Sequence, residues 1–247
     1  MAQKGDKYII EIGEVIETEK RKLYRVKGLR TLVFDEYGLD KLEKCGAEAL
    51  EIVPGLDALE KLLKAGARIL PGQKVDCIGP NGEKTECVVV ETRPEKAGEG
   101  CVVVAQRTVT HYMPFSIPDK LHPFGWNNYE KSAAREYLRT DFGKRFTAED
   151  LRHVVPRALP QTNGESDYFW LLDKDEVDGD SAFEWYQDAE NRQMKDTDGD
   201  ACSWFLRGAY PSHANDVRYV YAVGALNSSL GAYYAYGLVA AWVIRGS

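Results

Sequence analysis

The C-terminal end of this sequence lacks charge. No Asp, Glu, Lys or Arg lies between Arg218 and Arg245, although 29% of the 247 residues are charged. Tyrosine, serine, asparagine, glycine and alanine fill much of this segment. Antibody-type binding loops use the same residues, because tyrosine supplies rigid contact area and the small polar residues supply adaptable hydrogen bonds. An exposed surface of this composition favours ligand binding over catalysis.

Two other interpretations of the uncharged segment remain open. A membrane span needs about 20 predominantly apolar residues, but five tyrosines and the Asn-Ser-Ser stretch at 227–229 interrupt the run. We therefore expect no membrane span. The second alternative is an ordinary buried pair of strands. Alternation along a strand would place Tyr219, Tyr221 and Val223 on one face, with smaller residues on the other, which favours an exposed tyrosine face.

Known catalytic motifs are also missing. The four histidines show no H-E-x-x-H spacing, and the chain has no G-x-S-x-G elbow, phosphate-binding loop or dinucleotide fingerprint. His213 and Asp216 have the spacing of a base and its orienting carboxylate, but we interpret His213 as a loop residue. The sequence therefore predicts that the protein is not an enzyme and has no cofactor or metal site.

Acidic residues cluster between positions 173 and 200, and clustered oxygen ligands suit calcium. The Asp-Thr-Asp-Gly-Asp stretch at 196–200 lacks the rest of an EF-hand loop, including the final bidentate Glu. We expect a solvated polar loop here, with calcium binding as the alternative. The clustered aspartates are Asp173, Asp175, Asp178, Asp180, Asp196, Asp198 and Asp200.

No basic patch stands out in the sequence, and we expect no signal peptide. The formal net charge is −7 and no dense Lys/Arg cluster occurs, so nucleic-acid binding is not expected. The N-terminal residues lack the apolar core of a signal peptide. The five cysteines form no C-x-x-C pair and are odd in number. These features predict folding in a reducing cytoplasm with free thiols.

The first part of the chain has the pattern of a small α/β module, residues 1–69. Strands are expected at 8–12, 22–26 and 31–34. The heptapeptide at 38–44 nearly recurs at 55–61, and each copy has an Asp at a helix N-cap position and a Glu three residues later. We expect two short capped helices, followed by a boundary at Pro71-Gly72.

Residues 70–247 have the pattern of a larger α+β domain. Two strands rich in β-branched residues are predicted at 87–91 and 101–106, joined by a turn at 96–100. Helices are expected at 126–142, from Thr147 onward, and within 181–193. Further strands are predicted at 168–172, 203–207, 218–224 and 237–244.

Four motifs in this region resemble a bacterial and phage domain family of uncharacterised function. Residues 125–138 resemble its W-x-x-S-x-x-R-x-W-L-N helix, and 168–176 its F-L-L-S-x-x-E strand. Residues 203–207 resemble its W-W-L-R-S signature, and 237–244 its closing strand. The chain departs from the family pattern at Tyr137, at Gly208, and at positions 239–240. The resemblance implies a C-type-lectin-like fold of the formylglycine-generating-enzyme type, without that enzyme's catalytic cysteines.

The C-terminal segment also resembles the variable region of proteins diversified by retroelements. Errors at the first two bases of AAC codons yield Tyr, Ser, Asn, Gly, Ala, Val, Leu, His or Asp, but never Lys, Glu, Gln, Met or Trp. None of those five residues occurs between Tyr219 and Tyr236. The resemblance implies a variable region at 215–244, with Arg218, Val220, Gly224, Ala225 and Leu226 as its fixed frame. The implied ligand-binding residues are Tyr219, Tyr221, Val223, Asn227, Ser228, Ser229, Leu230, Tyr233, Tyr234 and Tyr236.

Together these features predict a phage- or prophage-encoded protein that recognises a bacterial surface protein or glycan. The N-terminal module resembles small modules of phage proteins, which implies attachment to a phage structural protein. We expect a homo-oligomer, with a trimer favoured, located on the virion or in the bacterial cytoplasm before assembly. The alternative is an invariant structural or assembly protein of a phage particle.

Overall fold

The computed structural model describes residues 12–17, 22–26, 33–35 and 52–246 of an α+β protein. The first three strands form an antiparallel sheet in the order β1-β2-β3. The strand predicted at 22–26 is confirmed. Residues 8–11 of the first predicted strand (8–12) and the helix expected at 38–44 lie outside the described residues. These strands are β1 (Ile12–Glu17), β2 (Lys22–Val26) and β3 (Val33–Asp35).

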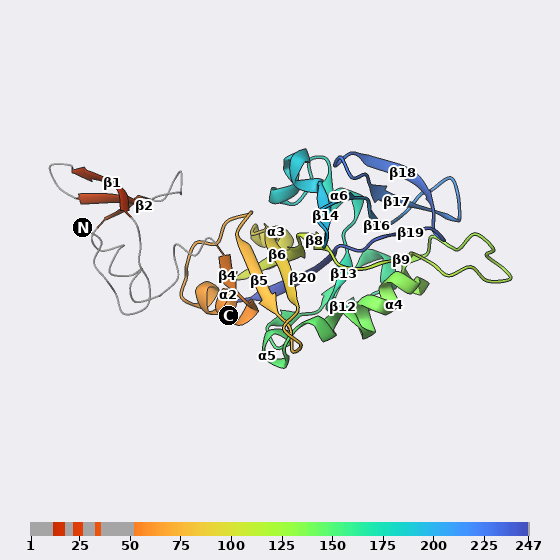
Figure 1. The fold of residues 1–247 in the computed structure, drawn as a ribbon, viewed down its shortest axis with the longest axis horizontal. Helices are drawn as coiled ribbons and strands as arrows, with labels where there is room; N and C mark the ends of the chain where they lie inside the picture. The colour runs from red at the N-terminus through yellow and green to blue at the C-terminus, as the bar shows by residue number, and fades with distance from the viewer. Residues whose placement is uncertain (1–11, 18–21, 27–32, 36–51, 247) are drawn as a thin grey trace.

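A seven-stranded sheet forms the centre of the fold (Figure 1). The valine-rich strand β7 is buried along its whole length, between β20 and β6. Both strands predicted at 87–91 and 101–106 are confirmed and pair antiparallel. The strand order is β10 (Val154–Val155), β20 (Ala240–Arg245), β7 (Cys101–Gln106), β6 (Lys84–Glu91), β5 (Lys74–Ile78) and β4 (Ile52–Pro54), and β13 (Trp170–Leu171) also pairs with β20.

The predicted boundary between residues 69 and 70 needs correction. Strand β4 pairs in parallel with β5 across that position, so residues from Ile52 onward belong to the central sheet. Helix α2 (Leu56–Lys64) packs on this sheet through Leu56, Leu59 and Leu62, which are all buried. Burial of these leucines ties the segment after β4 to the larger domain.

Helix α2 is confirmed, but its predicted capping box is wrong. Gly55 occupies the N-cap position and has no side chain to offer, while Asp57 lies inside the first turn. The carboxylate of Asp150 replaces the missing cap, since its Oδ1 accepts a hydrogen bond of 2.8 Å from the backbone N–H of Leu56. A residue 94 positions away in sequence therefore caps this helix.

A five-stranded sheet lies at the other end of the domain from α2 (Figure 1). Its central strand β16 pairs antiparallel with β17 and parallel with β19. The strand predicted at 218–224 ends at Val220, because a turn closed by Tyr221 and Ala225 follows it. The sheet order is β18 (Leu226–Gly231), β17 (Asp216–Val220), β16 (Trp204–Ala209), β19 (Ala235–Gly237) and β9 (Tyr112–Pro114).

Short helices and strands connect the two larger sheets. The helix predicted at 126–142 begins only at Ala133, where Ser132 caps it, and 3-10 turns flank it. The turn expected at 96–100 is confirmed at Glu99–Gly100, and a helix, α3, precedes it. The helical elements are α3 (Pro94–Ala97), η1 (Tyr129–Lys131), α4 (Ala133–Thr140), η2 (Phe142–Arg145), α5 (Ala148–Leu151), η3 (Pro160–Thr162), α6 (Lys174–Val177), η4 (Glu184–Gln187) and η5 (Ala189–Arg192).

The remaining strands are short. Two of them, β11 (Arg157–Ala158) and β12 (Ser166–Asp167), form a two-stranded ladder, and the other three form a small sheet in the order β15-β14-β8. The latter are β8 (Thr108–Val109), β14 (Met194–Asp196) and β15 (Ala201–Cys202). No described helix has the length and apolar character needed to cross a bilayer.

Aromatic rings fill the core where β20 meets the helices. Phe142, Phe146, Phe169 and Trp242 contact one another with ring centroids 5.0–6.2 Å apart. All four described cysteines are buried free thiols.

Candidate ligand-binding surface

The tyrosines of β17 and its turn divide between the core and the surface. Tyr219 is only 3% exposed, so its predicted place on the display surface needs correction. Its ring lies between those of Tyr221 and Tyr236, at centroid distances of 4.8 and 5.6 Å. Tyr221 is 41% exposed. The buried ring of Tyr219 thus packs against the exposed ring of Tyr221.

This support continues into the core. Tyr236 is half-buried and packs on Phe205, with ring centroids 5.6 Å apart. Phe205 in turn meets Phe115 edge-on at 5.7 Å. The aromatic row therefore runs from a fully buried ring to Tyr221 at the surface. Such packing fixes the position of the exposed ring and lowers the entropy that a binding partner must remove.

The turn after β17 is held in place by its glycine. Gly224 has φ +81° and donates a hydrogen bond of 2.8 Å to the carbonyl of Tyr221. A Cβ at this position would lie 2.7 Å from the backbone oxygen of Ala189. Only glycine fits such a close approach at positive φ. Gly224 therefore has the geometry expected of a frame residue, and Val223 beside it is 73% exposed.

A second tyrosine pair lies beyond β18. Tyr233 and Tyr234 have ring centroids 4.2 Å apart, and Tyr234 is 48% exposed. The hydrogen bond between their hydroxyls raises the pKa of Tyr233. Tyr233 thus remains a neutral phenol at physiological pH, suited to donating and accepting hydrogen bonds.

An exposed apolar loop next to this pair is absent from the sequence-based prediction. Ile117, Leu121 and Phe124 are exposed on the segment that follows β9, and the Phe124 ring lies 5.9 Å from that of Tyr233. The backbone of Ser116 donates to the carbonyl of Ala232 at 3.0 Å, which ties the loop to the tyrosine segment. Four large apolar residues between Pro114 and Gly125, without helical or strand periodicity, were the available signal.

The other predicted binding residues have mixed positions. Leu230 is half-buried and packs against the core. The backbone of 227–229 belongs to β18, but the side chains of Asn227, Ser228 and Ser229 lie outside what the structure describes. We define the tyrosine surface as the five residues that are exposed or partly exposed near these two tyrosine groups: Tyr221, Val223, Phe124, Tyr233 and Tyr234.

A groove of about 750 Å³ lies beside the Tyr221 turn. Its lining combines Trp185 and Met194 with the charged groups of Arg107 and Asp196. Gln193 also lines it and approaches the Cβ position of Gly224 to 3.1 Å. Gln193 therefore lies both on the groove and against the turn.

Two of the acidic residues of 173–200 accept hydrogen bonds within local turns. Asp173 caps α6 in a capping box with Glu176. Asp196 Oδ1 accepts from the backbone N–H groups of Asp198 and Asp200, at 3.0 Å each. Carboxylates used in this way stabilise the turns that surround the groove.

The His213–Asp216 pair belongs to a surface loop. Nδ1 of His213 lies 3.4 Å from Oδ2 of Asp216, and the imidazole is largely exposed. Asn127 Nδ2 donates to the backbone carbonyls of both residues, at 2.8 and 3.0 Å. These contacts fix the loop at the start of β17.

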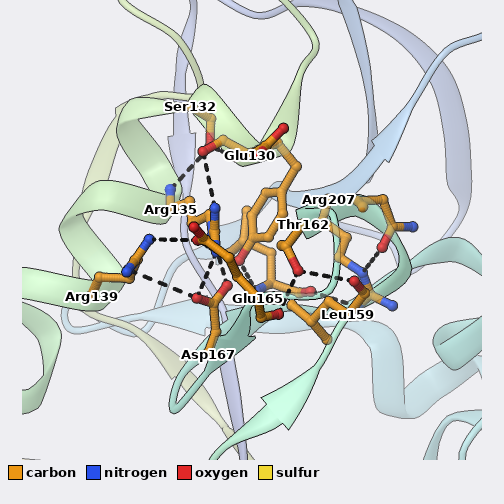
Figure 2. A network of polar contacts seen from close by, with 12 residues as sticks. Glu130, Ser132, Arg135, Arg139, Leu159, Thr162, Glu165, Asp167 and Arg207 are labelled. Carbon is orange, nitrogen blue, oxygen red and sulfur yellow. Dashed lines mark hydrogen bonds and ion pairs between the residues drawn. The ribbon is translucent and has the colours of Figure 1, made fainter.

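The S-x-x-R motif forms a buried polar network (Figure 2). Ser132 Oγ accepts from the backbone N–H of Arg135 at 3.0 Å and so caps α4. The guanidinium of Arg135 binds Asp167 on β12, with Nε–Oδ2 at 2.8 Å and Nη2–Oδ1 at 3.0 Å. Glu165 joins the same guanidinium from the surface at 2.9 Å. The motif therefore attaches helix α4 to the β11–β12 ladder.

The second arginine motif holds β16 against the preceding segment. Arg207 Nη1 donates to Glu176 Oε2 at 2.5 Å and to the carbonyl of Leu171 at 2.8 Å. Gly208 follows it, where the family pattern has Ser. A Cβ at Gly208 would lie 2.6 Å from Asp173 Oδ1, so glycine leaves room for the capping carboxylate.

These features define an α+β protein with two buried arginine networks and, apart from them, a solvent-facing set of tyrosines. A family model described as a domain of unknown function, DUF6273, matches residues 102–245. This match covers more than half of the chain, so the protein belongs to that family. No curated protein and no solved structure matches the chain.

Proposed function

We propose that this protein binds a ligand through the tyrosine surface. The observation that carries the proposal is the position of Tyr221: it is exposed, yet packed on the buried ring of Tyr219. Rigid aromatic side chains presented in this way are typical of binding hot spots. The uncharged segment around it leaves hydrogen bonding and apolar contact as the means of recognition. This role requires no catalytic step and no cofactor.

The proposal extends to the biological setting. The protein would be a phage- or prophage-encoded binder of a bacterial surface protein or glycan, built on a C-type-lectin-like scaffold. Residues 215–244 would vary among copies, as in retroelement-diversified proteins, while the arginine networks keep the scaffold constant. The N-terminal residues would attach to a phage structural protein, and trimeric display would raise avidity through effective concentration.

Binding of the labelled full-length protein to a panel of bacterial cells tests this function. Tyr221→Ala and Tyr234→Ala remove exposed rings from the tyrosine surface, and Tyr168→Ala is the matched control, because Tyr168 is 55% exposed outside it. We expect cell binding by the parent and the control, and a loss of about tenfold or more in each tyrosine-surface variant. Equal binding by all four proteins would contradict the proposal.

A further inference from the structure

Three carboxylates from two helical segments surround the half-buried imidazole of His153, and two of them face its buried Nε2. Asp57 and Glu60 lie one turn apart on α2, while Glu149 and His153 lie on α5 and directly after it. Nε2 of His153 is buried and has no hydrogen-bond partner among the described residues. The nearest carboxylate oxygens are Asp57 Oδ1 at 3.5 Å and Glu149 Oε1 at 3.8 Å. The three ligand atoms all lie within 4.8 Å of one another.

The outer oxygen of each carboxylate is already engaged by a cation. Lys61 binds Oδ2 of Asp57 at 2.6 Å, and Arg152 pairs with Oε2 of Glu149. One oxygen of each group therefore remains directed toward His153.

Glu60 fixes the other side of the imidazole. Its Oε2 lies 3.1 Å from His153 Nδ1, and Lys64 holds the same oxygen at 2.9 Å. A carboxylate that accepts from one ring nitrogen sets the tautomer and leaves the lone pair on the other nitrogen. This is the arrangement in which metal-binding histidines are commonly held.

A hydrogen bond from Nε2 to either carboxylate does not explain the cluster. Distances of 3.5 and 3.8 Å exceed the range of an N–H···O bond. An ion held at about 2.0–2.2 Å from each ligand places the ligand atoms roughly 3.0–3.5 Å apart. Small side-chain rotations close that difference, since the Glu149 side chain is exposed.

We propose that Asp57 Oδ1, Glu149 Oε1 and His153 Nε2 form a zinc site, with Glu60 as the group that orients His153. An imidazole and two carboxylates are common Zn²⁺ ligands, whereas calcium and magnesium prefer oxygen alone. The charge of the three carboxylates is offset by Lys61, Lys64 and Arg152. The affinity for Zn²⁺ therefore depends on the nitrogen ligand rather than on net charge. Three protein ligands leave one position for water.

Such a site would fasten α2 to α5. The same two helices already meet where Asp150 caps α2. In Figure 1 both helices lie at the end of the domain away from β17 and β18, so the zinc site is separate from the tyrosine surface. Bound zinc would stabilise the contact between these two helices, and the site stands independently of the proposed function.

Calorimetric titration of Zn²⁺ into untagged, chelator-treated full-length protein tests the proposal. A Cys45→Ser background removes the thiol that lies outside the described residues, and the four others are buried. The variants are His153→Ala, Glu149→Gln and Glu60→Gln, and His213→Ala is the control because His213 is an exposed histidine next to a carboxylate. Circular dichroism verifies folding, and Glu149→Gln carries the test if His153→Ala does not fold.

We expect one equivalent of Zn²⁺ to bind the parent and His213→Ala with equal affinity. Loss of a ligand or of the orienting carboxylate weakens binding by about 10–100-fold. Bound zinc also raises the melting temperature of the parent, since it stabilises only the folded state. No binding by the folded parent, unchanged affinity in Glu149→Gln, or equally tight binding of Ca²⁺ would overturn the proposal.

Discussion

Arg135 and Asp167 form a paired contact through two parallel hydrogen bonds, and both side chains are almost completely buried. The pair connects the S-x-x-R helix to β12, which lies 32 residues further along the chain. Removing one member of a buried ion pair leaves the other charge uncompensated in a medium of low polarity. This geometry explains why a motif arginine can belong to the scaffold rather than to a binding site.

Asp167→Ala should therefore destabilise the protein strongly. We expect a loss of about 3–5 kcal/mol in the free energy of unfolding, measured by urea denaturation. Glu165→Gln is the control, because Glu165 contacts the same guanidinium from the exposed side. The control should unfold at the same urea concentration as the parent. A similar small effect in both variants would show that the buried pair contributes little.

Tyr219 and Tyr221 should respond differently to truncation. Tyr219→Ala removes a buried ring between two aromatic neighbours and should cost roughly 3 kcal/mol or more. Tyr221→Ala removes an exposed ring and should change stability by about 0.5 kcal/mol or less. Thermal and urea unfolding of both variants provide the comparison. Equal destabilisation would place Tyr221 in the core and remove the basis of the tyrosine surface.

The long-range cap of α2 gives a third prediction. Asp150→Ala removes the acceptor for the Leu56 N–H and should destabilise the protein by about 1–2 kcal/mol. Asp150→Asn keeps a side-chain oxygen and should lose less. Urea unfolding distinguishes the two, and an equal loss in both variants would assign the effect to the negative charge instead of the hydrogen bond.

Acid should weaken the contact between Glu91 and Arg93. Burial raises the pKa of Glu91, but the hydrogen bonds from the Arg93 side chain and backbone outweigh it and bring the pKa below its ordinary value. The contact therefore contributes stability above the unfolded-state pKa of about 4.3. This contribution is lost as the pH falls through the lower folded-state pKa.

The free energy of unfolding measured from neutral to acidic pH tests this contact. Glu91→Gln should lower stability at neutral pH and give a shallower decline below about pH 4 than the parent. Glu95→Gln, at an exposed position on α3, should keep the parent's slope. A parent-like slope in Glu91→Gln would assign the acid sensitivity to other carboxylates.

Local sequence patterns predicted the helices and strands better than they predicted which side chains are exposed. The strands at 22–26 and 101–106 have continuous or alternating apolar residues, and their bounds match the structure. Alternation alone put Tyr219 and Tyr221 on one exposed face. The burial of Tyr219 depends on Phe205 and Tyr236 packing around it, which strand periodicity does not contain.

Long-range contacts account for the remaining differences. The cap of α2 comes from Asp150, and His153 meets Asp57 and Glu60 only because the two helices pack together. No spacing motif relates these residues, so the sequence predicted neither the cap nor the zinc site. Pro71-Gly72 indicated a boundary, but the pairing of β4 with β5 spans it.

The proposed function combines a constant scaffold with a variable binding surface. Sequencing the gene's 3′ end across a population that carries it tests this combination. We predict substitutions at the codons for the exposed positions, including Tyr221, Val223 and Tyr234, that match adenines in a nearby template repeat. The codons for Gly224 and Arg207 should remain constant. A uniform sequence without a template repeat would contradict the claim and favour an invariant structural protein.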